Sequence, residues 1–124
     1  MTLQDILDQI ANGKLLPAEM FLELDLDSIL DQRDEKVFEQ PWLECSERIE
    51  AAWNLKAPDG ATQELMDQVR KESFLAVSRA TSQHEIASYV SDDFGLISKS
   101  ILLGINDTYA NGLFEVYCQG KLPR

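Results

Sequence analysis

The chain contains few cysteine, histidine and basic residues, and each shortage excludes a class of function. Cys45 and Cys118 are too few for a disulfide framework, and neither has the nearby second cysteine that a zinc site needs. Lysine and arginine number 11 against 22 acidic residues, which gives a net charge of −11. Because affinity for nucleic acid depends on basic residues that displace counterions, we expect no nucleic-acid binding.

Long apolar runs are also missing. No stretch approaches the roughly 20 residues needed to cross a bilayer, and the residues after Met1 carry no basic group ahead of an apolar segment. The negative charge further disfavours binding to anionic lipid. We therefore expect a cytoplasmic protein with reduced cysteines and no membrane partner.

The composition is that of a folded protein. Hydrophobic residues make up 44% of 124 residues, which suffices for one core and predicts a single domain over residues 1–124. Helical periodicity dominates the chain and predicts an all-α bundle of five to six helices. The expected helices are 3–12, 17 to about 24, 41–56, 62 to about 80, 83–104 and a last one after Asn106 or Asp107, with a short turn or helix near 28–30.

Several local signals set these expected boundaries. Pro41 is predicted to start its helix, because proline ends or kinks a helix that arrives from upstream. In the turn 57–60, Gly60 is expected to allow a positive φ. Ser82 and Glu85 fit a capping box ahead of the helix 83–104, whose long apolar stripe makes it the expected central helix.

The segment 107–118 has an alternative reading. Asn111-Gly112 is a strong hairpin signal, so these residues could form two strands and make the fold α+β. A lone hairpin is marginally stable, and the apolar residues up to Tyr117 also fit one helical face. The helix is therefore favoured.

The acidic residues are distributed unevenly along the chain. Residues 1–60 hold 14 acids and 5 bases, whereas residues 61–124 hold 8 acids and 6 bases. The excess concentrates in residues 19–50, which hold 11 acids and 3 bases. Such a surface steers basic partners toward it, although acidity can also serve solubility alone.

Residues that could support catalysis are scarce. His84 is the single histidine, and Asp92 and Asp93 are adjacent acids on the long helix. We favour an exposed position for His84. For Asp92 and Asp93 we favour side chains that are solvated or paired with Lys99 or Arg79, although either aspartate could face inward. Cys45 is expected in the core and Cys118 in the core or at its boundary. We expect no catalytic residue, metal site or cofactor, and a small enzyme using Asp92, Asp93 or His84 is the weakest alternative.

The leading hypothesis is a non-enzymatic protein that binds a basic protein partner through the acidic segment. A concrete version is an inhibitor or immunity-type protein that blocks a basic nuclease or toxin by mimicking a polyanion. The predicted partner-binding residues are Asp31, Asp34, Glu35, Phe38, Glu39, Trp42, Glu44 and Glu47. The alternative is a structural or regulatory homo-oligomer, such as a homodimer, in which the apolar face of 86–105 and the stripe with Trp42 and Trp53 meet a second copy.

Overall fold

A computed structural model describes residues 1–124 and contains helices only. Six of its helices are α-helices and one is a short 3₁₀ helix. The elements are α1 (Leu3–Ala11), η1 (Ala18–Phe21), α2 (Leu26–Asp34), α3 (Lys36–Lys56), α4 (Gly60–Thr81), α5 (His84–Leu103) and α6 (Thr108–Cys118). The expected all-α bundle is confirmed.

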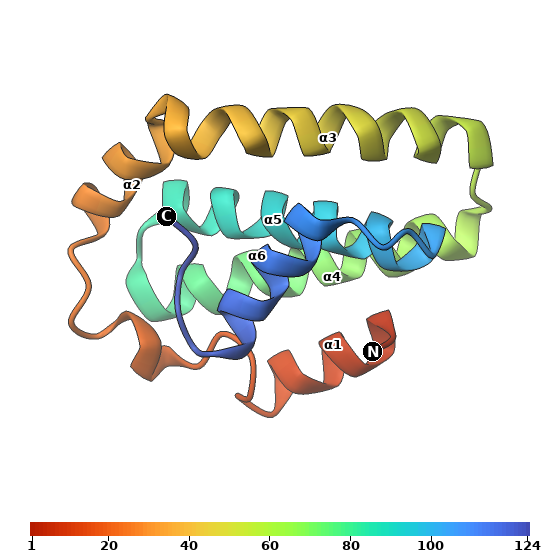
Figure 1. Ribbon diagram of the computed structural model, residues 1–124. Helices are drawn as coiled ribbons and strands as arrows, with labels where there is room; N and C mark the ends of the chain where they lie inside the picture. Colours follow the sequence, from red (N-terminus) through yellow and green to blue (C-terminus); the bar gives the residue numbers. More distant parts are fainter.

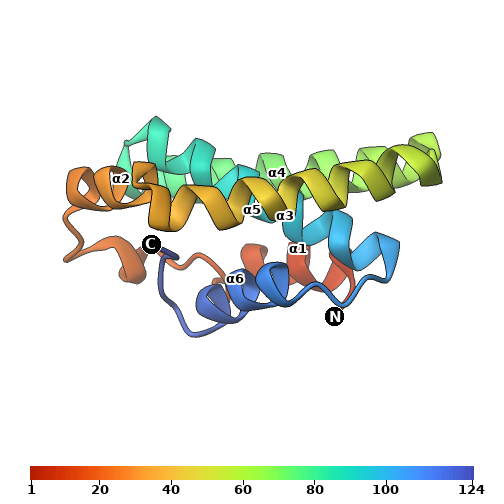
Figure 2. The same cartoon turned by 45° about the horizontal axis from the view of Figure 1, so that its top comes forward.

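The helix α5 is the central element, as the sequence predicts. It pairs along its length with α4, and α3, α6 and α2 also pack on it. Figure 1 shows α3 along one edge of the molecule and α1 on the opposite side, where α1 packs on α4. The view in Figure 2 shows that α6 lies on a different side of α5 from α4.

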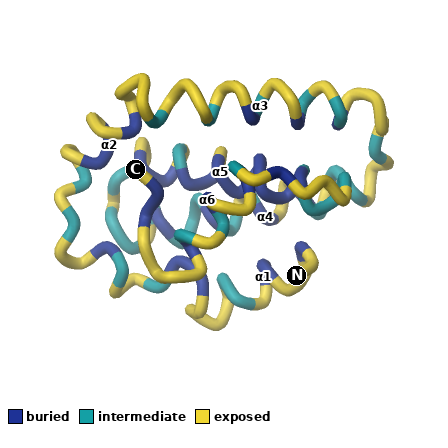
Figure 3. The backbone as a smooth tube through the Cα atoms, viewed as in Figure 1, coloured by how far each residue is buried: buried dark blue, intermediate teal, exposed yellow.

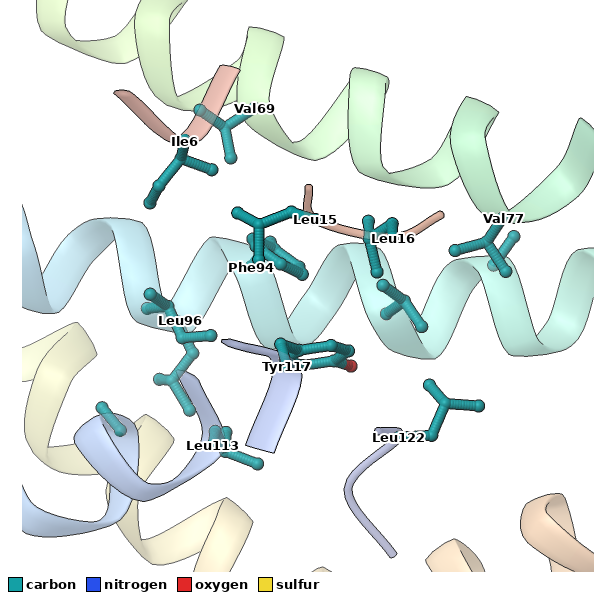
Figure 4. Close-up of a cluster of buried hydrophobic side chains, with 14 of the residues drawn as sticks. Ile6, Leu15, Leu16, Val69, Val77, Phe94, Leu96, Leu113, Tyr117 and Leu122 are labelled. Atoms are coloured by element: carbon teal, nitrogen blue, oxygen red, sulfur yellow. The ribbon is translucent and has the colours of Figure 1, made fainter. Parts of the chain in front are cut away.

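The hydrophobic core forms one continuous cluster of 24 buried residues around α5. Phe94 of α5 lies at its centre, with its ring centroid 4.8 Å from that of Tyr117 on α6. Figure 4 shows side chains from α1, the loop after it, α4, α5 and α6 converging on this pair. The N-terminal and C-terminal parts of the chain therefore share a single core.

Two expected boundaries in the N-terminal half are wrong. In place of a helix over 17–24, only the four residues of η1 are helical. Helix α3 starts at Lys36, so Pro41 lies inside it and does not begin it. The missing N–H of Pro41 leaves the carbonyl of Val37 without its helical partner, and because Val37 is 80% exposed, water can bond that carbonyl.

The expected positive φ at Gly60 and the expected capping box at Ser82 are also wrong. Asp59 caps α4 by accepting a hydrogen bond from the backbone N–H of Thr62, and Gly60 is already helical. The positive φ of this turn belongs to Ala57. Ser82 ends α4 in the left-handed conformation, so the capping box with Glu85 does not form and Gln83 caps α5 instead.

The C-terminal segment is a helix, and the hairpin alternative is wrong. Asp107 accepts a hydrogen bond from the backbone N–H of Ala110 and thereby caps α6. Asn111 and Gly112 lie within the helix, where the burial of Leu113 and Tyr117 outweighs the local turn preference. No helix of the protein combines the length and hydrophobicity that spanning a lipid bilayer requires.

Candidate partner-binding surface

The acidic residues of segment 19–50 lie on the outside of the molecule. Ten of the eleven acids are exposed, and Glu50 is half-buried. The structure contains four ion pairs, and only Glu50, paired with Lys99, belongs to this segment's acids. The other ten acids therefore present charges that no basic side chain of this chain neutralises by direct contact.

The basic residues of the same segment are mostly engaged elsewhere. Arg33 pairs with Asp93 of α5, and Arg48 pairs with Asp107 at the start of α6. Lys36 alone forms no ion pair. Pairing within the fold thus removes bases from the segment's surface and leaves its acids, which strengthens the local negative field.

Helix α3 carries four of the eleven acids, Glu39, Glu44, Glu47 and Glu50. Its outer face, which is exposed along nearly its whole length in Figure 3, contains a shallow groove. The groove is lined by Lys36, Glu39, Gln40, Leu43, Glu44 and Glu47. Leu43 is 47% exposed between the carboxylates, so the groove offers apolar contact as well as charge.

The structure brings together some of the predicted binding residues and separates others from them. Glu39, Glu44 and Glu47 share the α3 groove, and Asp34 and Glu39 share a neighbouring pocket. Asp31 and Glu35 are exposed at α2 and at its junction with α3, outside both. The short helix η1, which carries Glu19, lies across the molecule from α3 (Figure 1). We use the name acidic surface for Asp34, Glu39, Glu44 and Glu47.

A pocket of about 160 Å³ adjoins the acidic surface where α2, α3 and α5 meet. Its lining consists of Arg33, Asp34, Phe38, Glu39, Trp42, Tyr89 and Asp92. Phe38 and Trp42, both predicted as partner-binding residues, are half-buried here rather than freely exposed. They form walls of the pocket.

A fully buried carboxylate holds this corner of the fold together. Arg33 donates two hydrogen bonds to Asp93, at 2.8 and 2.7 Å, and a third to the carbonyl of Pro123. Asp93 also accepts the indole N–H of Trp42 at 2.9 Å and the hydroxyl of Tyr117 at 2.5 Å. One carboxylate therefore ties α2, α3, α5 and α6 together, and Arg33 anchors the C-terminal segment beside α2 (Figure 1).

Arg33 and Tyr117 of this buried cluster both keep their protons at neutral pH. Burial alone would lower the pKa of Arg33, but the hydrogen bonds and charge of Asp93 outweigh it and raise that pKa. Burial and the charge of Asp93 raise the pKa of Tyr117 well above its ordinary value. Arg33 thus stays charged, and Tyr117 keeps the proton that it donates.

Asp92, next to Asp93, faces the pocket. Arg70 of α4 donates a hydrogen bond of 2.9 Å to it, and partial burial raises the pKa of Asp92 although Arg70 opposes this. The side chain of Arg70 passes over Gly95, where a Cβ would lie 3.0 Å from Cδ of Arg70. The glycine therefore leaves the space through which Arg70 reaches Asp92.

A second polar cluster joins α3 to α6. Asp107 accepts hydrogen bonds from the thiol of Cys45 at 3.3 Å and from Arg48 at 3.1 Å. Burial would raise the pKa of Asp107, but the hydrogen bonds from Ala110, Cys45 and Arg48 lower it. Burial and the nearby Asp107 raise the pKa of Cys45 to about 12, so this thiol is protonated and packed in the core, as expected.

The residues considered for catalysis differ in their exposure and in their hydrogen-bond partners. His84 is exposed, as expected, with Nδ1 3.1 Å from the hydroxyl of Ser78. Asp93 has both oxygens occupied by donors, and Asp92 pairs with Arg70, so the expected pairing with Lys99 or Arg79 is wrong. Cys118 is exposed rather than packed in the core. No group of three or more potential ligands is arranged to hold a metal ion.

The structure also locates the apolar face proposed for self-association. The apolar residues of α5 from Ile86 to Ile97 are buried within the chain's own core. Trp53 is buried against the same core. Other helices of the same molecule therefore cover this face up to Ile97, whereas Ile101, Leu102 and Leu103 are only partly buried and Ile105 is 38% exposed.

Sequence reasoning missed Arg33, Tyr89 and Tyr117 as members of this corner. Arg33 follows Leu26, Ile29 and Leu30 at helical spacing, so it occupies a core position of α2. That position is the signal that could have identified Arg33 as inward-facing. The contact of Tyr89 with Asp34, at 2.5 Å, joins residues 55 positions apart and has no local signal.

A comparison with protein-family models identifies the family of this chain. The family model described as "Immunity protein PIM1" matches residues 5–124, which is nearly the whole chain. No curated protein matches the chain.

Proposed function

Because the chain belongs to the PIM1 family of immunity proteins, we propose that it is a non-enzymatic inhibitor that binds a basic toxin through the acidic surface. Membership of an immunity protein family implies a partner such as a toxin. The finer part of the proposal concerns the chemistry of that partner and the surface that binds it.

The observation that supports a basic partner is that acids on α3 are exposed and unpaired. Glu39, Glu44 and Glu47 are exposed and take part in no ion pair. Unpaired like charges on one helix repel one another and cost the free protein stability. A cationic partner removes that repulsion on binding, and complementary charge also raises its association rate.

A nuclease is the toxin class that best fits this charge. Proteins that cut nucleic acids bind a polyanion with basic side chains. An acidic helix face offers carboxylates in place of phosphates, and Leu43 adds the apolar contact that phosphates lack. We propose that the acidic surface occupies the substrate-binding groove of such a toxin.

The test uses the toxin encoded beside this protein, since an inhibitor must be made together with its target. Cells that express the toxin are given the wild-type protein, Glu44→Lys/Glu47→Lys, or Glu64→Lys/Asp67→Lys. The last variant makes the same charge change on exposed residues of α4 and serves as the matched control. We expect the wild type and the control to restore growth and the α3 variant to fail.

Salt provides a second readout. The association rate of the wild-type protein with the purified toxin is measured between about 0.05 and 0.5 M salt, a range over which screening of exposed charges becomes strong. We expect the rate to fall at least about tenfold. A toxin with an acidic binding face, or an association rate independent of salt, contradicts the proposal.

A further inference from the structure

We propose that the pocket between α2, α3 and α5 binds the guanidinium group of one arginine side chain of the toxin. This inference rests on the proposed function and specifies which part of the partner enters which part of the surface. It joins three features of the pocket: its charge, its aromatic walls and its unused hydrogen-bond acceptors.

The charge of the pocket favours a cation. Its lining carries three carboxylates, Asp34, Glu39 and Asp92, and one guanidinium, that of Arg33. The charge of Arg33 is already balanced by the bidentate pair with Asp93 directly behind it. Arg70 balances Asp92 from outside the lining. Asp34 and Glu39 have no basic partner, so the pocket keeps an excess of negative charge.

Unused acceptors are present on all three carboxylates. Asp34 uses Oδ1 to accept the hydroxyl of Tyr89, and Asp92 uses Oδ1 to accept Arg70. Oδ2 of each aspartate accepts no hydrogen bond, and the carboxylate of Glu39 accepts none at all. A guanidinium has five donors in one plane and can bond to more than one of these acceptors together.

The walls suit a flat cation. Phe38, Trp42 and Tyr89 line the pocket, and a guanidinium stacks on aromatic rings more readily than an ammonium does. The chain itself shows this packing, because the guanidinium carbon of Arg33 lies 4.5 Å from the ring centroid of Phe38 and 5.2 Å from that of Tyr89. The volume of about 160 Å³ holds one side-chain end but not a helix or strand.

The position of the pocket connects it with the acidic surface. Glu39 belongs both to the pocket and to the groove on the outer face of α3. A partner that lies along Glu44 and Glu47 can therefore place one arginine in the pocket without leaving the helix. Arginine is also a residue that contributes strongly at the centres of protein interfaces.

The direct test uses N-acetyl-arginine amide as a probe for the isolated full chain. Titration at low salt is followed by NMR on the two indole N–H signals, with Trp42 in the pocket and the buried Trp53 as internal reference. We expect a saturable shift of the Trp42 signal in the millimolar range and no shift of the Trp53 signal. N-acetyl-citrulline amide, of similar shape but uncharged, and N-acetyl-lysine amide are titrated in parallel.

The variant Glu39→Gln removes a pocket charge while keeping the size of the side chain, and Glu64→Gln, at an exposed position of α4 outside the pocket and the acidic surface, is the matched control. We expect Glu39→Gln to weaken binding of the arginine probe about threefold to tenfold and Glu64→Gln to leave it unchanged. An equal response to citrulline or to lysine overturns the guanidinium assignment. If the probe does not shift the Trp42 signal, or binds Glu39→Gln as tightly as the wild type, the pocket is not its binding site.

The toxin separates failure of this inference from failure of the proposed function. If Glu44→Lys/Glu47→Lys weakens toxin binding while Glu39→Gln does not, the acidic surface binds the toxin and the pocket does not receive its arginine. If the wild-type protein does not bind the toxin, the proposed function itself fails, whatever the probe does. Weakened binding by both variants supports the two proposals together.

Discussion

Helices α3 and α5 have almost the same length but opposite relations to water. Eleven of the 20 residues of α5 are buried, compared with three of the 21 residues of α3. The acid Asp93 of α5 is enclosed and accepts four hydrogen bonds, whereas Glu44 and Glu47 of α3 are exposed and unpaired. An acid thus holds the fold together in α5, whereas the acids of α3 lie unpaired on the outside, where we propose that they bind the partner.

The largest expected effect comes from removing the buried acid. Asp93→Ala leaves the guanidinium of Arg33 buried without its partner, so we expect a loss of about 3–5 kcal/mol in the free energy of unfolding. The neighbouring Asp92→Ala breaks an ion pair between half-exposed side chains, and its loss should stay below about 1 kcal/mol. Urea denaturation followed by circular dichroism measures both, and equal losses would contradict the difference between the two sites.

A smaller loss is expected from removing one donor to the buried acid. Tyr117→Phe deletes the hydroxyl that donates to Asp93, and a hydrogen bond to a charged group contributes about 1.5–3 kcal/mol. Tyr89→Phe deletes a hydroxyl that donates to the exposed Asp34, so its loss should be below about 1 kcal/mol. If thermal and urea unfolding show the reverse order, burial does not decide the strength of these bonds.

The cluster between α3 and α6 should show a dependence on pH. Because the pKa of Asp107 is lowered in the folded protein, its ionised form stabilises the fold fully above the ordinary value of 3.8. That contribution is lost as the pH falls through the lowered value. Asp107→Asn, which keeps the cap of α6, should therefore cost about 1–2 kcal/mol at pH 7 and progressively less as the pH falls below the ordinary value of 3.8. Urea unfolding of the wild type and the variant across this pH range measures the cost. A cost that does not depend on pH would contradict the claim that ionised Asp107 stabilises the fold.

The smallest change in stability is expected from the outer face of α3. Glu44→Gln/Glu47→Gln removes the repulsion between two charges at i, i+3 and also the attraction of Glu44 to Arg48 at i, i+4, so we expect a change of no more than about 0.5 kcal/mol in the free energy of unfolding. The measurement is again urea denaturation, at low salt. A clear loss would show that these acids support the fold and would remove the distinction between α3 and α5.

Much of the helical framework could be predicted from the sequence, because apolar periodicity and caps are local signals. The boundaries failed where a tertiary contact overrides a local rule. Helix α3 begins at Lys36, ahead of Pro41. It continues through Pro41 because the hydrogen bond that proline removes is the one to the carbonyl of the exposed Val37, where water can replace it. The Asn111-Gly112 pair lies in a helix because its neighbours are needed in the core.

The candidate site was predictable only in part. The exposure of Glu39, Glu44 and Glu47 follows from their spacing on α3 relative to Cys45 and Ile49. Arg33 and Asp93 each occupy a core position of an amphipathic helix, which indicates that both face inward. The pairing itself joins residues 60 positions apart, and no local pattern in one sequence specifies such a contact.

The central claim is that the acids of α3 bind the partner and do not support the fold. It is tested most directly by the Kd of the neighbouring toxin for Glu44→Lys/Glu47→Lys, measured by calorimetry beside Glu64→Lys/Asp67→Lys. We expect the α3 variant to bind at least about 100-fold more weakly than the wild type, and the α4 variant to stay within about threefold. Equal Kd values for the two variants would contradict the claim.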